Sequence, residues 1–285
     1  MRKFITLVRC ELWEHHNLWR VPLILLALVV LANAGFSGAA SWLGMLPPEL
    51  STDVLGAALG SLGSLVYFVF TFLVLFYLVD CLYIERKDKS ILFWRSLPVS
   101  DTLAVAAKLF VAALLIPVII WLTIVAAQVL TLLFQWMGSE HGQNLFGIVS
   151  LGTYWCNLLL VLLLTSLWSL PLMSWFLFCS SWAKRTPLIT ALSIPAVLIL
   201  LNRIFPVGLD VSGLIAARIP FGFRFGGSEQ EILLGLLGLT ANRGEVLEVN
   251  AFKTFLLQPD LWAGLFTAGI FFAMTVWTRR WRDDS

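Results

Sequence analysis

Hydrophobic residues are distributed along this chain in long runs that shorter charged stretches separate. A helix needs roughly 17–25 mostly apolar residues to cross a bilayer. Six runs meet that length, at residues 21–43, 59–82, 103–137, 149–182, 187–205 and 261–277. The pattern predicts an all-α integral membrane protein with six transmembrane helices, in a single transmembrane domain over residues 1–285.

The first twenty residues follow a different pattern. On a helix, Phe4, Leu7, Val8 and Leu12 fall on one apolar stripe, and Glu11 lies next to it. Charges recur until residue 20, which favours a separate helix over the mere start of the first span. We therefore expect an amphipathic interfacial helix over residues 1–20.

Residues 206–259 form the largest segment between spans. An aromatic stretch at 219–225 and an apolar stretch at 231–239 are both too short and too often interrupted by charge to cross a membrane. We expect an outer helical insertion before the last span. Pro259 indicates the first turn of that last helix, where the missing N–H costs nothing.

Composition agrees with the membrane assignment. The chain is 59% hydrophobic and 13% charged, with mean hydropathy +0.89, whereas soluble domains are about 25% charged. Fourteen of the 19 Lys and Arg residues lie in one set of flanks, which the positive-inside rule assigns to the cytoplasm. Both termini are then cytoplasmic, as an even number of spans requires. The four cysteines form no CxxC pair or metal-binding cluster.

The segment 84–101 carries the densest charge and lies between the second and third spans. Its composition favours a short cytoplasmic helix that ends before Pro98, and Ser100 is a plausible N-cap for the third span. Such a helix suits a partner groove, but an ordinary basic inner loop explains the same spacing. The candidate docking residues are Glu85, Arg86, Lys87, Asp88, Lys89, Ser90, Arg95 and Pro98.

Motifs of catalysis are missing from the sequence. It has no Gly-Lys pair and hence no phosphate-binding loop, no GxSxG elbow and no HExxH. His15 and His16 are adjacent and cannot form an i, i+4 metal pair. We expect no catalytic residue and no metal site. Asp80 is the only acid well inside an apolar run, and pairing with Arg86 or Lys87 is favoured over a transport role.

The charged segment resembles the inner loop between spans two and three of type 2 ABC exporter permeases, the membrane subunits of bacterial ATP-binding cassette transporters. The family has a membrane-end Asp, a Glu-Arg pair, a Ser or Thr, a Leu-rich helix, Pro-Val-Ser and a Lys. Lys89 departs from the pattern, since the family often has Gly there. The matching positions are Asp80, Glu85, Arg86, Ser90, Ile91, Leu92, Leu97, Pro98, Val99, Ser100 and Lys108.

This resemblance implies a mechanism and a set of partners. Two permease chains, as a homodimer or with a related permease, would pair in the bacterial cytoplasmic (inner) membrane above two ABC ATPase subunits. ATP and Mg would bind to the ATPase, so this chain would be a transport subunit without enzyme activity or cofactor of its own. The lipid bilayer is the remaining partner, and no nucleic acid is expected.

An aromatic stripe on the second span is the candidate substrate path. Phe68, Phe72 and Phe76 repeat every four residues, and Tyr67 adjoins them. Contact with lipid or other helices explains this stripe too. If it lines a path, the cargo is apolar or amphipathic: a lipid, a lipid-linked molecule, a peptide or a drug. A non-transporting membrane scaffold is the alternative function, and a secondary transporter lacks the expected charges and repeats.

Overall fold

Helices account for nearly all of the chain that can be placed. The computed structural model describes residues 2–35, 48–90, 99–138, 151–205, 211–216, 218 and 255–281, and these contain no strand. The helices are α1 (Arg2–Glu14), α2 (Asn17–Gly35), α4 (Pro48–Lys87), α6 (Asp101–Phe110), the π-helix η1 (Val111–Leu115), α7 (Ile116–Gly138), α8 (Leu151–Trp168), α9 (Leu170–Trp182), α10 (Pro187–Ile204), α11 (Val211–Ala216) and α14 (Pro259–Trp281).

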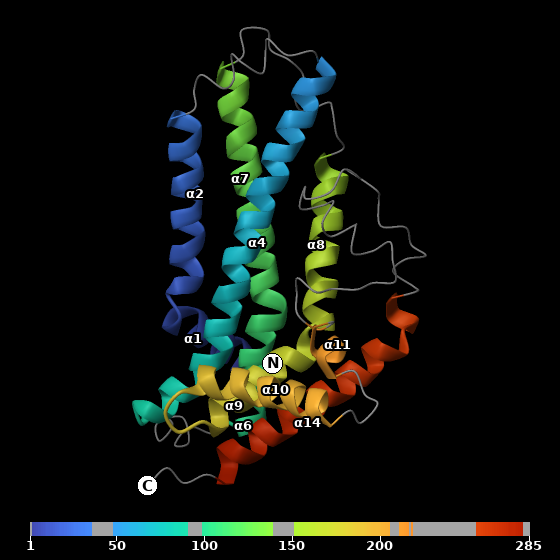
Figure 1. The fold of residues 1–285 in the computed structure, drawn as a ribbon. Coiled ribbons are helices and arrows are strands. Elements are labelled where there is room, and N and C mark those ends of the chain that lie inside the picture. The colour runs from blue at the N-terminus through green and yellow to red at the C-terminus, as the bar shows by residue number, and fades with distance from the viewer. Residues whose placement is uncertain are drawn as a thin grey trace.

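Two groups of helices make up the fold (Figure 1). Helices α2, α4, α7 and α8 run along the long axis, whereas α9, α10 and α14 lie across one end. Helix α7 packs against α2, α4 and α8, and α9 packs against α4, α10 and α14. The shared core includes Phe70, Ile116 and Leu177, all fully buried. The end where α4 finishes therefore holds most of the contacts between the two groups.

The number of membrane-length helices equals the six that the hydropathy pattern predicts only if each bent helix pair is counted as one span. Four are long and apolar enough alone: Gly60–Lys87, Asp101–Phe134, Pro187–Ile204 and Pro259–Trp281. Two bent pairs would raise the total to six if each counts as one span. The all-helical, multi-pass character is thus confirmed among the described residues, while the six-span arrangement stays a prediction.

The expected fourth span, residues 149–182, is not one straight helix. It breaks between α8 and α9 with a bend of 54°. Pro171 explains the break, since a proline cannot donate to the carbonyl four residues earlier and its ring crowds that carbonyl. Ser169 at the break donates its hydroxyl to the carbonyls of Thr165 (2.9 Å) and Ser166 (3.2 Å).

Helix α1 has the predicted apolar stripe, but it packs on protein. It bends 53° from α2, and Leu7 and Glu11 are buried. The Phe4 and Phe110 rings meet edge to face at 5.3 Å, which joins α1 to α6. Because Glu11 lies on the buried side, α1 carries a charge into the interior as well as apolar contacts.

Helix α4 continues through the start of the charged segment. It contains 40 residues, or about 60 Å at 1.5 Å per residue, and ends only at Lys87. Glu85, Arg86 and Lys87 therefore belong to the last turn of α4, so the expected cytoplasmic helix does not begin near residue 84. The rest of its expected range, at residues 91–98, lies outside the described residues. The helix stops because Lys89 adopts a left-handed conformation, with φ of 56°.

Glycine at position 89 should fit this turn better than lysine. A side chain in the left-handed region costs roughly 1–2 kcal/mol that glycine does not pay. We expect Lys89→Gly to raise the unfolding free energy of the purified chain by about 1 kcal/mol. Lys87→Gly is the matched control, and it should be destabilising by about 1 kcal/mol because residue 87 is helical. Equal effects of the two changes, measured by unfolding in mixed micelles, would contradict this account.

Two predicted helix starts are confirmed. The Ser100 hydroxyl accepts from the Leu103 N–H at 3.4 Å and caps α6, and α14 begins at Pro259. Between α6 and α7 the helix widens into the π-turn η1, so the registers of the two parts differ. Lys108 lies before this turn.

Part of the predicted outer insertion anchors α8 to α14. Within residues 206–259 the structure describes α11, Arg218 and residues 255–259. The guanidinium of Arg218 donates to the carbonyls of Trp168 and Asp260 and lies 4.2 Å from the Trp168 ring centroid. A Cβ at Gly264 would overlap that guanidinium, so the guanidinium keeps this position only beside a glycine and would have to shift for any other residue.

Replacing Gly264 with alanine is expected to displace Arg218 from this anchor. The guanidinium is the end of a flexible side chain and can move aside, so the expected loss is that of its hydrogen bonds, about 1 kcal/mol, and the apparent Tm in detergent should fall. Gly269→Ala is the matched control on the same helix, since its Cβ would meet nothing within 4 Å. Alanine there should be neutral or stabilising by up to about 1 kcal/mol. A Tm for Gly264→Ala at or above that of Gly269→Ala would contradict the assigned contact.

Candidate functional site

A buried lysine lies where four helices meet beneath the end of α4. Lys108 of α6 is 1% exposed. Its ammonium lies 2.6 Å from the Glu11 carboxylate of α1 and 2.8 Å from the Glu85 carboxylate of α4. A buried ammonium is tolerated only when it is paired, and two carboxylates pair it here. Lys108 thus joins the N-terminal helix to the last turn of α4.

Arg279 extends the pairing to the C-terminal helix. Its Nη1 lies 2.8 Å from the second Glu85 oxygen, and its Nε lies 3.2 Å from Asp101. Glu85 lies shortly before residues 88–100 and Asp101 lies directly after them. Arg279 therefore contacts a residue on each side of that segment. Glu11, Glu85, Asp101, Lys108 and Arg279 form what we call the charge network. Each Glu85 oxygen has a cationic partner, on a different helix.

The other oxygen of Glu11 faces Tyr77 and His15. The Tyr77 hydroxyl donates to it at 3.2 Å, and the His15 Nε2 lies 3.9 Å away. His15 is in the turn between α1 and α2, edge to face with Tyr77. Burial lowers the pKa of the His15 imidazole below its ordinary value, although the Glu11 carboxylate opposes this. The ring is therefore neutral at pH 7 and adds no third cation.

Arg86 points into the bundle as well, toward α9. Its Nη2 donates to the carbonyls of Ser180 (2.7 Å) and Ala183 (2.8 Å). The Ser180 hydroxyl accepts in return from the N–H groups of Leu82 and Tyr83. The sequence favoured a pairing of Asp80 with Arg86 or Lys87, whereas these two hydrogen bonds of Arg86 go to α9. The Glu-Arg pair thus fixes the end of α4 to α6, α14 and α9.

The remaining candidate docking residues divide into three groups. Lys87, Asp88 and Lys89 are exposed, and the Ser90 hydroxyl donates to the Glu85 carbonyl at 3.2 Å. Arg95 and Pro98 lie outside the described residues. The exposed Lys184 and Arg185 lie beside Ala183, the residue that Arg86 contacts. Lys87, Lys89, Lys184 and Arg185 are the exposed cations near this contact, and we call them the basic surface.

The aromatic stripe on α4 is split between two faces. Phe68, Phe72 and Phe76 are about half exposed, and the first two rings lie 4.9 Å apart. Phe72 and Phe76 line a cleft between α4 and the α1–α2 junction, together with Asp80. Tyr67, by contrast, is buried and lines a separate, half-open cavity on another side of α4. The four residues therefore do not form one continuous surface.

Several residues of the charge network were not among the sequence-based candidates. Lys108 was noted only as the end of the family pattern, and Glu11 only as a neighbour of the apolar stripe. Arg279 was counted as an inner flank charge. A usable signal existed for Lys108, because positions 105, 107, 111 and 112 around it are apolar and buried on the same helix.

Comparison with protein-family models, curated proteins and solved structures found no match. The class of the protein therefore comes from its own structure. The described residues form helices only, and four to six of these helices are apolar and long enough to cross a membrane. Over the part of the chain that the structure describes, this is a helical, multi-pass membrane protein with a buried charge network at one end of its bundle.

Proposed function

We propose that this chain is the permease subunit of an ATP-driven exporter, moved by a separate ATPase that docks at the end of α4. The proposal rests on the contacts that attach the end of α4 to the neighbouring helices. Glu85 and Arg86 connect it to α6, α9 and α14, while Lys87, Asp88 and Lys89 directly beside them stay exposed. A force applied at the exposed turn would reach four helices through short, charged contacts.

Such an attachment suits a docking point better than an ordinary loop. A topogenic inner loop needs only its basic residues on the cytoplasmic side. It does not need a carboxylate with cations from two other helices or an arginine bonded to two carbonyls of a third. In this proposal the end with the charge network faces the cytoplasm. Helix α1 and the last turn of α14 reach the same network, which supports two cytoplasmic termini in a bacterial inner membrane.

The partners follow from the same proposal. ATP and Mg bind to the ATPase, because this sequence has no phosphate-binding loop. A second permease copy completes the path, and the half-exposed aromatic stripe on α4 offers it an apolar face. The cargo is apolar or amphipathic, since the described spans carry little charge away from the network.

Co-purification tests the proposal directly. The full chain is expressed with the ATPase encoded beside its gene, extracted in mild detergent and reconstituted in nanodiscs. We expect a stable complex whose ATP hydrolysis differs from that of the ATPase alone. A partner that binds without any nucleotide dependence would support the scaffold function instead. A chain that purifies without any such ATPase overturns the proposal.

A further inference from the structure

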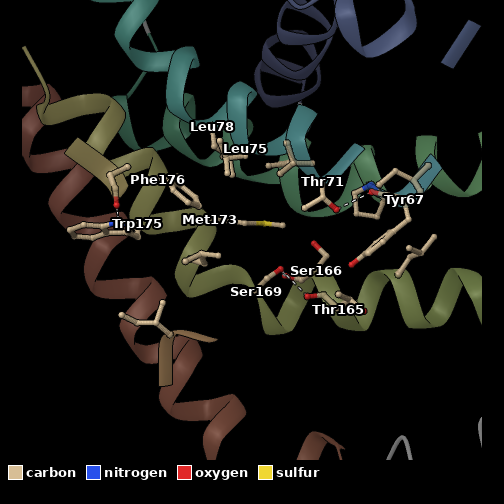
Figure 2. Close-up of a pocket in the computed structure, with 18 of the residues that line it drawn as sticks. Tyr67, Thr71, Leu75, Leu78, Thr165, Ser166, Ser169, Met173, Trp175 and Phe176 are labelled. Carbon is tan, nitrogen blue, oxygen red and sulfur yellow. Dashed lines mark hydrogen bonds between the residues drawn. The ribbon is translucent and has the colours of Figure 1, made fainter. Parts of the chain in front are cut away.

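A second feature of the fold is a half-open cavity of about 270 Å³ between α4, α7, α8, α9 and α10. Figure 2 shows its wall, with Tyr67 and Thr71 on α4 facing Ser166, Ser169 and Met173 on the bent α8–α9 pair. An engineered apolar cavity of about 150 Å³ is large enough to bind benzene. This cavity is therefore large enough for a ligand, and it lies away from the charge network.

Three hydroxyl groups in the wall already donate hydrogen bonds to backbone carbonyls. The Thr71 hydroxyl donates to the Tyr67 carbonyl at 2.9 Å, and the Thr165 hydroxyl to the Val161 carbonyl at 2.7 Å. Ser169 donates to two carbonyls of its own helix. Because these hydroxyls already donate to carbonyls, they need no hydrogen bond from a ligand. The lining of the cavity is therefore mostly apolar.

Each of two prolines in the wall leaves one backbone carbonyl without its helical N–H donor. In both cases a side chain from another helix donates to that carbonyl instead. Pro117 cannot donate to the Ala113 carbonyl, and Ser166 Oγ donates to it at 2.6 Å. Pro195 likewise leaves the Ala191 carbonyl without its helical donor, and Trp175 Nε1 donates to it at 3.1 Å. With these carbonyls bonded from neighbouring helices, water finds few partners in the cavity, and apolar cavities of this kind stay dry.

Helix α10 separates the cavity from the outside of the bundle. Ala191, Leu192 and Pro195 line the cavity. Leu192 is also 52% exposed, and Ile189 on the same helix is 63% exposed. In a membrane this exposed apolar surface faces hydrocarbon. The cavity therefore has its entrance beside a lipid-facing helix, and what enters from there is apolar.

We propose that this cavity binds a single hydrocarbon chain that enters beside α10. The chain comes either from a membrane lipid or from a free apolar molecule dissolved in the bilayer, and both share the chemistry that the cavity accepts. The site does not depend on ATP or on an ATPase partner, so it stands independently of the exporter proposal. Its contacts are dispersion and apolar burial, worth about 0.8 kcal/mol per buried methylene.

Photo-crosslinking of the full chain in nanodiscs tests the site. One arm uses a phospholipid with a diazirine near the end of one acyl chain, and the other uses a diazirine-bearing alkyl alcohol in unlabelled lipid. Met173 is 8% and Leu78 1% exposed, so only a chain inside the cavity reaches them. We expect adducts on Met173 or Leu78 in at least one arm, and that arm identifies the source. Ile189 should be labelled in any case and serves as the positive control.

Filling the cavity should abolish the buried adducts. Ala191 is buried in the wall, and Ala191→Leu should lower labelling of Met173 about tenfold, which corresponds to about 1.4 kcal/mol of affinity. Ala196→Leu makes the same change on an exposed position of α10 and should leave labelling unchanged. Absence of buried adducts in the unmodified chain while Ile189 is labelled overturns the proposal, whether or not the variants fold. Undiminished Met173 labelling in a folded Ala191→Leu chain does so too.

Discussion

Replacing Lys108 with methionine is expected to destabilise the chain more than any other single change in its charged residues. Methionine keeps most of the volume but removes the cation between Glu11 and Glu85, which then face each other in the interior. Breaking a buried ion pair from one side costs about 3–5 kcal/mol. Equilibrium unfolding in mixed micelles should show a loss of this size, and much of the chain should aggregate on extraction.

Two comparisons separate this effect from the loss of a positive charge in general. Lys87→Met removes an equal charge from an exposed position and should change the unfolding free energy by less than about 0.5 kcal/mol. Adding Glu11→Gln to Lys108→Met should restore part of the loss, because one buried carboxylate disappears with the cation. A double variant whose loss equals the sum of the single losses would mean that Glu11 and Lys108 do not interact.

The charge network also shows why the sequence predicted the fold better than the site. The apolar stripe of α1, the Ser100 cap and the start at Pro259 each depend on residues within one or two helical turns, so their pattern is visible in the chain. Glu85 and Arg86 looked like solvated charges because neighbouring positions 87–89 are charged. Their true partners, Lys108, Arg279 and Ser180, are between 23 and 194 positions away, and no local pattern records such a contact.

The bend between α8 and α9 was missed for a related reason. Hydropathy stays high across residues 149–182, because a kink changes direction without changing polarity. Pro171 was a visible cue, but proline alone permits a bend and does not require one. Ser169 and the packing of α9 against α14 complete the break, and that packing is a tertiary contact.

Charge reversal on the exposed turn is expected to abolish partner binding while leaving the fold intact. Lys87→Glu with Lys89→Glu places two negative charges on the basic surface, where the proposed ATPase docks. Mismatched charges across an interface cost several kcal/mol, so association should weaken at least about tenfold. The measurement is the fraction of ATPase retained by the reconstituted chain, and the unmodified complex should also weaken as salt rises.

Two comparisons decide what a loss of binding means. Arg9→Glu with Arg20→Glu carries the same charge change on exposed positions of α1 and α2 and should bind as the unmodified chain does. Glu85→Gln should lower the unfolding free energy, because Lys108 and Arg279 lose their shared carboxylate, while Lys87 and Lys89 remain in place. If both charge-reversed chains retain the partner equally, the end of α4 is not the docking point. If only Lys87→Glu with Lys89→Glu loses it, at unchanged stability, the exposed turn at the end of α4 is the docking point, directly beside the paired Glu85 and Arg86.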